Sequence, residues 1–122
     1  MERNGWNHSI LPPTVGGMTP WGVADHVRAV MPGRVIFVST ASHGGVWVHP
    51  EIERVHIPAE CQAIARQYAP AGWYEEDCDC VIPLALVPGL DAKTRGDAIL
   101  FAVQMGARMA PVVAELAKRQ TA

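Results

Sequence analysis

The chain has 122 residues, of which 49% are hydrophobic and 18% charged, and its formal net charge is -2. This length fits one domain with its own core, and the hydrophobic fraction excludes an intrinsically disordered chain. The nearly balanced charge provides no basic field of the kind that nucleic-acid-binding proteins use, so nucleic acid is not an expected partner.

The cysteine content and the apolar runs indicate the compartment. Cys61, Cys78 and Cys80 are an odd number without the spacing of a disulfide framework, which favours a reducing environment. The first residues lack the pattern of a signal peptide, and no apolar run approaches the roughly twenty residues that cross a bilayer. We therefore expect a soluble cytoplasmic protein without membrane association.

The N-terminal segment is rich in residues that interrupt regular structure. Residues 1–20 contain Asn-Gly, Pro-Pro and Gly-Gly pairs. We expect residues 1–18 to form an extended arm, anchored by burial of Trp6, Ile10 and Leu11. Residues 19–122 are expected to form a single domain.

Three β-strands are predicted next, over residues 24–30, 34–40 and 46–49. Gly33 and the Gly44-Gly45 pair separate these apolar runs and are typical of hairpin connections, so the strands should form an antiparallel meander. The first run also fits two helical turns, and that alternative stays open.

Helices are predicted in the second half of the chain. His49-Pro50-Glu51 should end the meander, and a loop should carry Val55, His56 and Ile57. Pro58 is then expected to open a helix over residues 59–69. A second helix is expected over 75–86, with a buried strand as the competing interpretation because Pro83 interrupts the run. Asp91 should cap a last helix that bends or restarts at Pro111.

The predicted fold class is therefore α+β, with a small antiparallel β-meander packed against two to four helices.

The turn at residues 40–45, T-A-S-H-G-G, is the first chemically distinctive stretch. His43 suits a general base or a metal ligand, and Ser42 beside it suggests a nucleophile, although neighbouring residues of a strand point to opposite faces. The structural alternative is a turn whose hydroxyls and imidazole satisfy loop amides.

An acidic stretch follows about thirty residues later, and its carboxylates are the second group of candidate site residues. Glu75, Glu76, Asp77 and Asp79 could hold a divalent cation through their oxygens, or form a solvated helix start. Cys78 is a candidate nucleophile, although the carboxylates around it disfavour a thiolate. The histidine and cysteine spacings match no zinc pattern, so no metal and no cofactor is expected.

Tryptophan is frequent, and its positions suggest both core and surface roles. Trp21 and Trp73 are expected in the core, whereas Trp47 alternates with valines in a strand of which one face could be an exposed binding surface. Methionine and small residues in the last helix also suit self-association, so a homodimer is left open.

Three motifs in order resemble those of a known family. They are T-P-W-G at 19–22, S-T-A-S-H-G-G at 39–45 and G-W-Y-E-E-D-C-D at 72–79. Over residues 19–87 the chain resembles an uncharacterised domain of bacteriophages, plasmids and integrated mobile elements. Cys80 stands where that family usually has an aromatic residue.

The resemblance implies a functional setting. Small proteins of mobile elements often interfere with host defence, so we expect a non-enzymatic interaction protein that binds a host protein complex, such as an inhibitor of CRISPR–Cas or restriction systems. The alternative is a small hydrolase or metal-dependent enzyme that uses His43 with the acidic stretch.

Both hypotheses draw on the same part of the sequence, where the imidazole of His43 is expected to donate to Glu75 or Glu76. The expected binding residues are Ser42, His43, Trp47, Glu75, Glu76 and Asp77, and the catalytic set of the enzyme alternative is His43, Glu75, Glu76 and Cys78.

Overall fold

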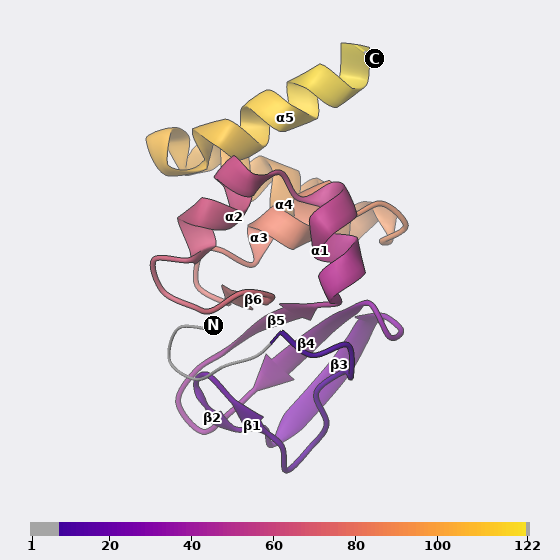
Figure 1. The fold of residues 1–122 in the computed structure, drawn as a ribbon. Coiled ribbons are helices and arrows are strands. Elements are labelled where there is room, and N and C mark those ends of the chain that lie inside the picture. Colours follow the sequence, from indigo (N-terminus) through magenta and orange to yellow (C-terminus); the bar gives the residue numbers. More distant parts are fainter. Residues whose placement is uncertain (1–7, 122) are drawn as a thin grey trace.

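The computed structural model describes residues 8–121 and has an α+β fold. A four-stranded antiparallel sheet has the order β3-β4-β5-β6, and a small second sheet pairs β1 with β2. The helices gather on one side of the larger sheet, with α5 farthest from it (Figure 1). The strands are β1 Met18–Thr19, β2 Gly22–Val23, β3 His26–Met31, β4 Val35–Ser39, β5 Gly44–Val48 and β6 Trp73–Glu75. The helices are α1 Pro50–His56, α2 Ala59–Ala65, α3 Val81–Leu86, α4 Ala92–Gln104, the 3-10 helix η2 Gly106–Met109 and α5 Ala110–Thr121.

The predicted antiparallel meander is confirmed by β3, β4 and β5. In the β4–β5 pair, Val35 lies opposite Val48 and Ile36 opposite Trp47. These pairs alternate between the two faces of the sheet, because successive side chains of a strand point in opposite directions.

Both faces of the central strands are covered. Val35, Val46, Val48 and Tyr74 belong to the larger core, which they share with the helices. Ile36, Val38, Trp47 and Trp73 form a second cluster on the opposite face, closed by Ala24 and by Trp21. Every residue of β5 is consequently buried, which explains its unbroken apolar pattern.

Gly45 allows this second cluster to close. A Cβ at Gly45 would lie 2.3 Å from Cη2 of Trp21 and 2.4 Å from the carbonyl oxygen of Tyr74. The Trp21 ring therefore lies where a side chain would otherwise stand, and it packs edge-to-face on Trp73 with ring centroids 5.6 Å apart. The burial expected for Trp73 is confirmed, while Trp21 is half-buried.

The predicted loop through Val55 and His56 is wrong, because Pro50–His56 is helix α1. Pro50 occupies the first turn, and Nδ1 of His49 accepts a hydrogen bond from the backbone N–H of Glu51. A side-chain cap followed by proline is a helix start, and this signal was present in the sequence.

The predicted helix over residues 75–86 is correct only in its second half. Glu75 closes strand β6, which pairs with β5, and the helix α3 begins at Val81 with Pro83 as its third residue. Proline is tolerated there because the first turn of a helix has no internal partner for its N–H groups. Residues Trp73–Glu75 become strand β6 because they pair with β5, and the local sequence does not encode this pairing.

The limits of the second helix also differ from the prediction. Pro58 is the N-cap of α2 and not its first residue, and the helix ends at Ala65. Cys61 and Ala65 are buried as expected, but Tyr68 is 62% exposed because it lies beyond the helix.

The predictions for the two ends of the chain have mixed outcomes. Ile10 and Leu11 are 67% and 73% exposed, so they do not anchor the N-terminal arm, and Trp6 lies outside the described residues. Asp91 caps α4 by accepting from the N–H of Thr94, and the chain restarts as α5 next to Pro111, as predicted. Within residues 8–121, the helices are all too short or too polar to cross a bilayer.

Replacing Gly45 by Ala should destabilise the fold by about 2 kcal/mol or more, since the methyl group would overlap Trp21 and a backbone carbonyl that cannot withdraw. The free energy of unfolding in urea measures the effect. Gly96→Ala is the matched control, because Gly96 lies in α4 and a Cβ added there would meet nothing within 4 Å. That substitution should stabilise the protein by about 0.5–1 kcal/mol through helix propensity. Equal effects of the two substitutions would contradict this packing.

Candidate functional site

The turn that carries His43 is closed by Thr40. The Thr40 hydroxyl donates to the carbonyl oxygen of His43 at 2.6 Å, and the N–H of His43 lies 3.2 Å from the same hydroxyl oxygen. The backbone N–H of Thr40 also donates to that carbonyl at 2.8 Å. Ser42 and His43 are both exposed on this turn. The turn geometry is thus fixed by a threonine hydroxyl and the backbone.

The acidic stretch lies directly beside this turn. The N–H of Glu76 donates to the carbonyl oxygen of Gly44 at 3.0 Å, and Glu75 lies opposite Gly45 in the β5–β6 pair. A Cβ at Gly44 would be 3.3 Å from Oε2 of Glu76 and 2.5 Å from a backbone carbonyl. The expected approach of the two segments, enabled by the glycine pair, is therefore present.

The expected contact between the imidazole of His43 and the acidic stretch is not formed in the described part of the chain. Within residues 8–121, the ring of His43 forms no hydrogen bond or ion pair with Glu75 or Glu76, and the segments are joined by their backbones. Glu75 and Glu76 are partly exposed, and Asp77 is exposed. Four of the expected binding residues thus lie near one end of β5, with Asp77 in the adjoining turn.

Asp79 separates from the other carboxylates and is 1% exposed. Its Oδ1 accepts from Nη2 of Arg108 at 2.7 Å, and the guanidinium of Arg108 lies over the ring of Tyr68 at 5.1 Å. This ion pair joins the β6–α3 turn to η2. In the described part of the chain, no cluster of three or more His, Cys, Asp or Glu side chains could hold a metal ion.

The cysteines near this stretch pack inward. The thiol of Cys80 donates to the carbonyl oxygen of Glu76 at 3.1 Å, and burial, assisted by the Glu76 and Asp79 carboxylates, raises its pKa to about 12. Cys78 is half-buried against the larger core. Trp47 is only 1% exposed, so it is a core residue and does not offer a surface to a partner.

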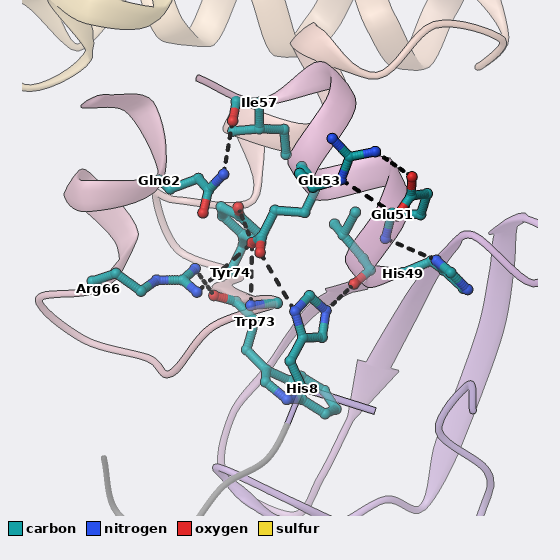
Figure 2. A network of polar contacts seen from close by, with 12 residues as sticks. His8, His49, Glu51, Glu53, Ile57, Gln62, Arg66, Trp73 and Tyr74 are labelled. Atoms are coloured by element: carbon teal, nitrogen blue, oxygen red, sulfur yellow. Dashed lines mark hydrogen bonds and ion pairs between the residues drawn. The ribbon is translucent and has the colours of Figure 1, made fainter. Parts of the chain in front are cut away.

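The densest polar contacts surround Glu53, a residue that the sequence analysis did not single out. Glu53 is 5% exposed, and its Oε2 accepts from the hydroxyl of Tyr74 at 2.5 Å and from the N–H of Gly72 at 3.1 Å. Figure 2 shows the carboxylate of Glu53 close to the side chains of Tyr74, Arg66 and His8. A buried carboxylate is stable only when such partners replace its water.

Two basic side chains complete this Glu53 network. Nη1 of Arg66 lies 3.7 Å from Oε2 of Glu53, while Nη2 donates to the carbonyl of Trp73 at 2.8 Å. Nδ1 of His8 lies 3.5 Å from Oε1, and its Nε2 is 2.6 Å from the carbonyl oxygen of Val48 (Figure 2). The network therefore joins the N-terminal segment, α1, β6 and the end of α2.

Gly72 makes room for the His8 ring. Its φ of +88° is in the left-handed region, and a Cβ would lie 2.3 Å from Nε2 of His8. The sequence held a signal for the burial of Glu53. In a helix, Glu53 lies on the same face as Ile57, four residues later, and Ile57 is buried; recognising α1 as a helix would therefore have predicted that Glu53 faces the core.

A model of a domain of unknown function (DUF7007) matches residues 14–114 of the chain. The chain belongs to this family. The match covers a longer stretch than the three motifs at residues 19–87. No curated protein and no solved structure matches the chain. The Glu53 network extends beyond the matched span of the DUF7007 domain, since His8 precedes residue 14.

Replacing Glu53 by Leu in this DUF7007 domain should lower the free energy of unfolding by about 2–4 kcal/mol, because Arg66, the Tyr74 hydroxyl and the Gly72 amide lose their acceptor. Combining it with Tyr74→Phe should cost less than the sum of the two single substitutions, by about 1 kcal/mol or more. Urea unfolding measures both. Glu51→Gln, at an exposed pair with Arg54, is the control and should change little. If the effects of the two substitutions on the free energy of unfolding simply add, the contact between Glu53 and Tyr74 is contradicted.

Alkaline pH should destabilise the DUF7007 domain through its buried acids. Burial raises the pKa of Tyr74 well above 10, and that of Cys80 from 9.0 to about 12. The folded state holds these protons more tightly, so their stabilisation is complete below about pH 9 and is lost as the pH rises toward the folded values.

The loss from each group should reach at most about 1.4 kcal/mol per pH unit. Unfolding in urea between pH 8 and 11, under reducing conditions, measures it. Cys80→Ala should reduce the slope above pH 9, and an unchanged slope would show that this thiol does not titrate on unfolding.

Proposed function

We propose that this protein is a non-enzymatic binding protein that acts by occupying a surface of a partner protein. The observation that carries the proposal is the exposure of three apolar side chains on α4. Leu100, Phe101 and Val103 are 57%, 53% and 55% exposed, while Ala98 and Ala102 of the same helix face the core. Leu100 and Val103 are three residues apart and lie side by side on the helix, and adjacent exposed apolar groups are a feature of protein interaction sites.

The polar chemistry of the described residues is compatible with this role. Asp79, Glu53 and the thiol of Cys80 are engaged in contacts that hold elements together. His43 and Asp77 are exposed near the end of β5.

The partner that we propose belongs to a bacterial defence system, such as a CRISPR–Cas or restriction complex. This part of the proposal rests on the resemblance of the three motifs to proteins of mobile elements. In this proposal the protein acts in the cytoplasm of a bacterial cell, where it would bind the defence complex and block its action.

The test combines a defence assay with matched surface variants. Cells that carry an active CRISPR–Cas or restriction system should plate a targeted phage more efficiently, by about tenfold or more, when they express the protein. Leu100→Ser with Val103→Ser should abolish the gain, because these changes remove apolar contacts without touching the core. Val55→Ser is the control, since Val55 on α1 is also 55% exposed. If Val55→Ser abolishes the gain in phage plating and the double substitution on α4 does not, an interface on α4 is contradicted.

The enzyme alternative predicts a different result for His43. If His43 acts with Glu75, Glu76 or Cys78, His43→Ala should abolish turnover of a substrate and leave the melting temperature unchanged, because the exposed ring is not part of the core. If the protein only binds through α4, the same substitution should leave phage plating unchanged. Substrate turnover that His43→Ala abolishes, with an unchanged melting temperature, would favour the enzyme.

A further inference from the structure

An open cleft lies between the β3–β4 turn and the start of α1, at the opposite end of β5 from the His43 turn. It has a volume of about 510 Å³, within the range of small-molecule sites. Its lining residues are Pro32, Gly33, Arg34, His49, Glu51 and Ile52. The N–H of His49 donates to the carbonyl oxygen of Arg34 at 2.8 Å, so the two walls of the cleft are joined by the backbone.

His49 offers a fixed hydrogen-bond donor in this cleft. A backbone N–H can only donate, so the contact of 3.0 Å from Glu51 N to Nδ1 requires that this nitrogen carries no proton. The proton of the neutral ring is then on Nε2, which lies on the side of the ring away from α1 (Figure 2). The ring also packs edge-to-face on Trp47, with centroids 6.1 Å apart, which holds its orientation.

Arg34 offers a charged donor. It is exposed, and within residues 8–121 its guanidinium forms no hydrogen bond or ion pair. The other charge in the lining belongs to Glu51, whose carboxylate is paired with Arg54. The cleft thus has one unpaired positive charge, one neutral N–H donor and an apolar wall formed by Pro32 and Ile52.

We propose that this cleft binds a carboxylate that carries an apolar group. The planar fork of Arg34 suits the two oxygens of a carboxylate, Nε2–H of His49 supplies a further hydrogen bond, and the apolar group lies against Pro32 and Ile52. A single positive charge beside Glu51 matches a monoanion better than a phosphate dianion.

The first measurement is a titration of the ¹⁵N-labelled protein with 4-methylpentanoate, followed by the amide signals of Gly33, Glu51 and Ile52. The acid should bind saturably, with a dissociation constant on the order of 1 mM for a ligand of this size. The neutral 4-methylpentanamide and inorganic phosphate should each bind at least about tenfold more weakly. Equal binding of the amide, or tighter binding of phosphate, would overturn the proposal.

Variants then assign the donors. Arg34→Gln should weaken binding of the acid by about tenfold, and His49→Asn by about threefold or more, because asparagine can still cap α1 but lacks the Nε2 donor. Arg28→Gln is the matched control, since Arg28 is an exposed arginine of β3 that lies over Phe37 and does not line the cleft. Equal losses for Arg28→Gln and Arg34→Gln would show a non-specific charge effect and overturn the site.

A pair of peptides distinguishes the sources of the carboxylate. A pentapeptide that ends in Leu with a free carboxylate is compared with the same peptide ending in an amide. Tighter binding of the free peptide than of 4-methylpentanoate assigns the cleft to a chain terminus, and tighter binding of the small acid assigns it to a small molecule; each supports a carboxylate site. Failure of both to bind overturns the site without bearing on the α4 interface.

Discussion

The buried carboxylate of Glu53 is the interaction on which the arrangement of this fold depends. It accepts from the Tyr74 hydroxyl and the Gly72 amide, and it lies within ion-pair distance of Arg66 and His8. Glu53 and these partners come from four separate segments, so one charge fixes how α1 and the N-terminal segment sit against the sheet. Removing a single partner of a buried charge costs more than the pair contributes, which makes such a network a strong constraint on one arrangement.

Local signals predicted the parts of the fold that local chemistry determines. The meander followed from apolar runs separated by glycines, and the cap at Asp91 and the restart near Pro111 followed from the side chains themselves. Strand β6 was missed because three residues become a strand only by pairing with β5. The helix α1 was missed although His49 and Pro50 mark its start, because its seven residues are too few to show a repeating helical pattern of apolar side chains.

The candidate site likewise has features that the local sequence predicts and features that only the folded chain creates. The approach of the acidic stretch to the glycine pair was predictable, because Gly44 and Gly45 leave room for a neighbouring segment. The atoms that join them were not, since the contact is a backbone hydrogen bond from Glu76 to Gly44 and the imidazole of His43 takes no part in it. Glu53 and Tyr74 are 21 residues apart in sequence, and only the folded chain brings them together. Among the described residues, the His43 turn, the exposed apolar side chains of α4 and the cleft beside Arg34 are accessible to a partner or a ligand.

Hydrogen exchange at the Gly72 amide tests the central role of Glu53 most directly. This N–H donates to the buried carboxylate, so in the native protein it should exchange only through opening of the structure around α1 and β6. Glu53→Leu should accelerate its exchange well beyond that of the amides in β4, which pair with neighbouring strands. Rapid exchange of Gly72 in the unsubstituted protein, or an unchanged rate in the variant, would contradict the account.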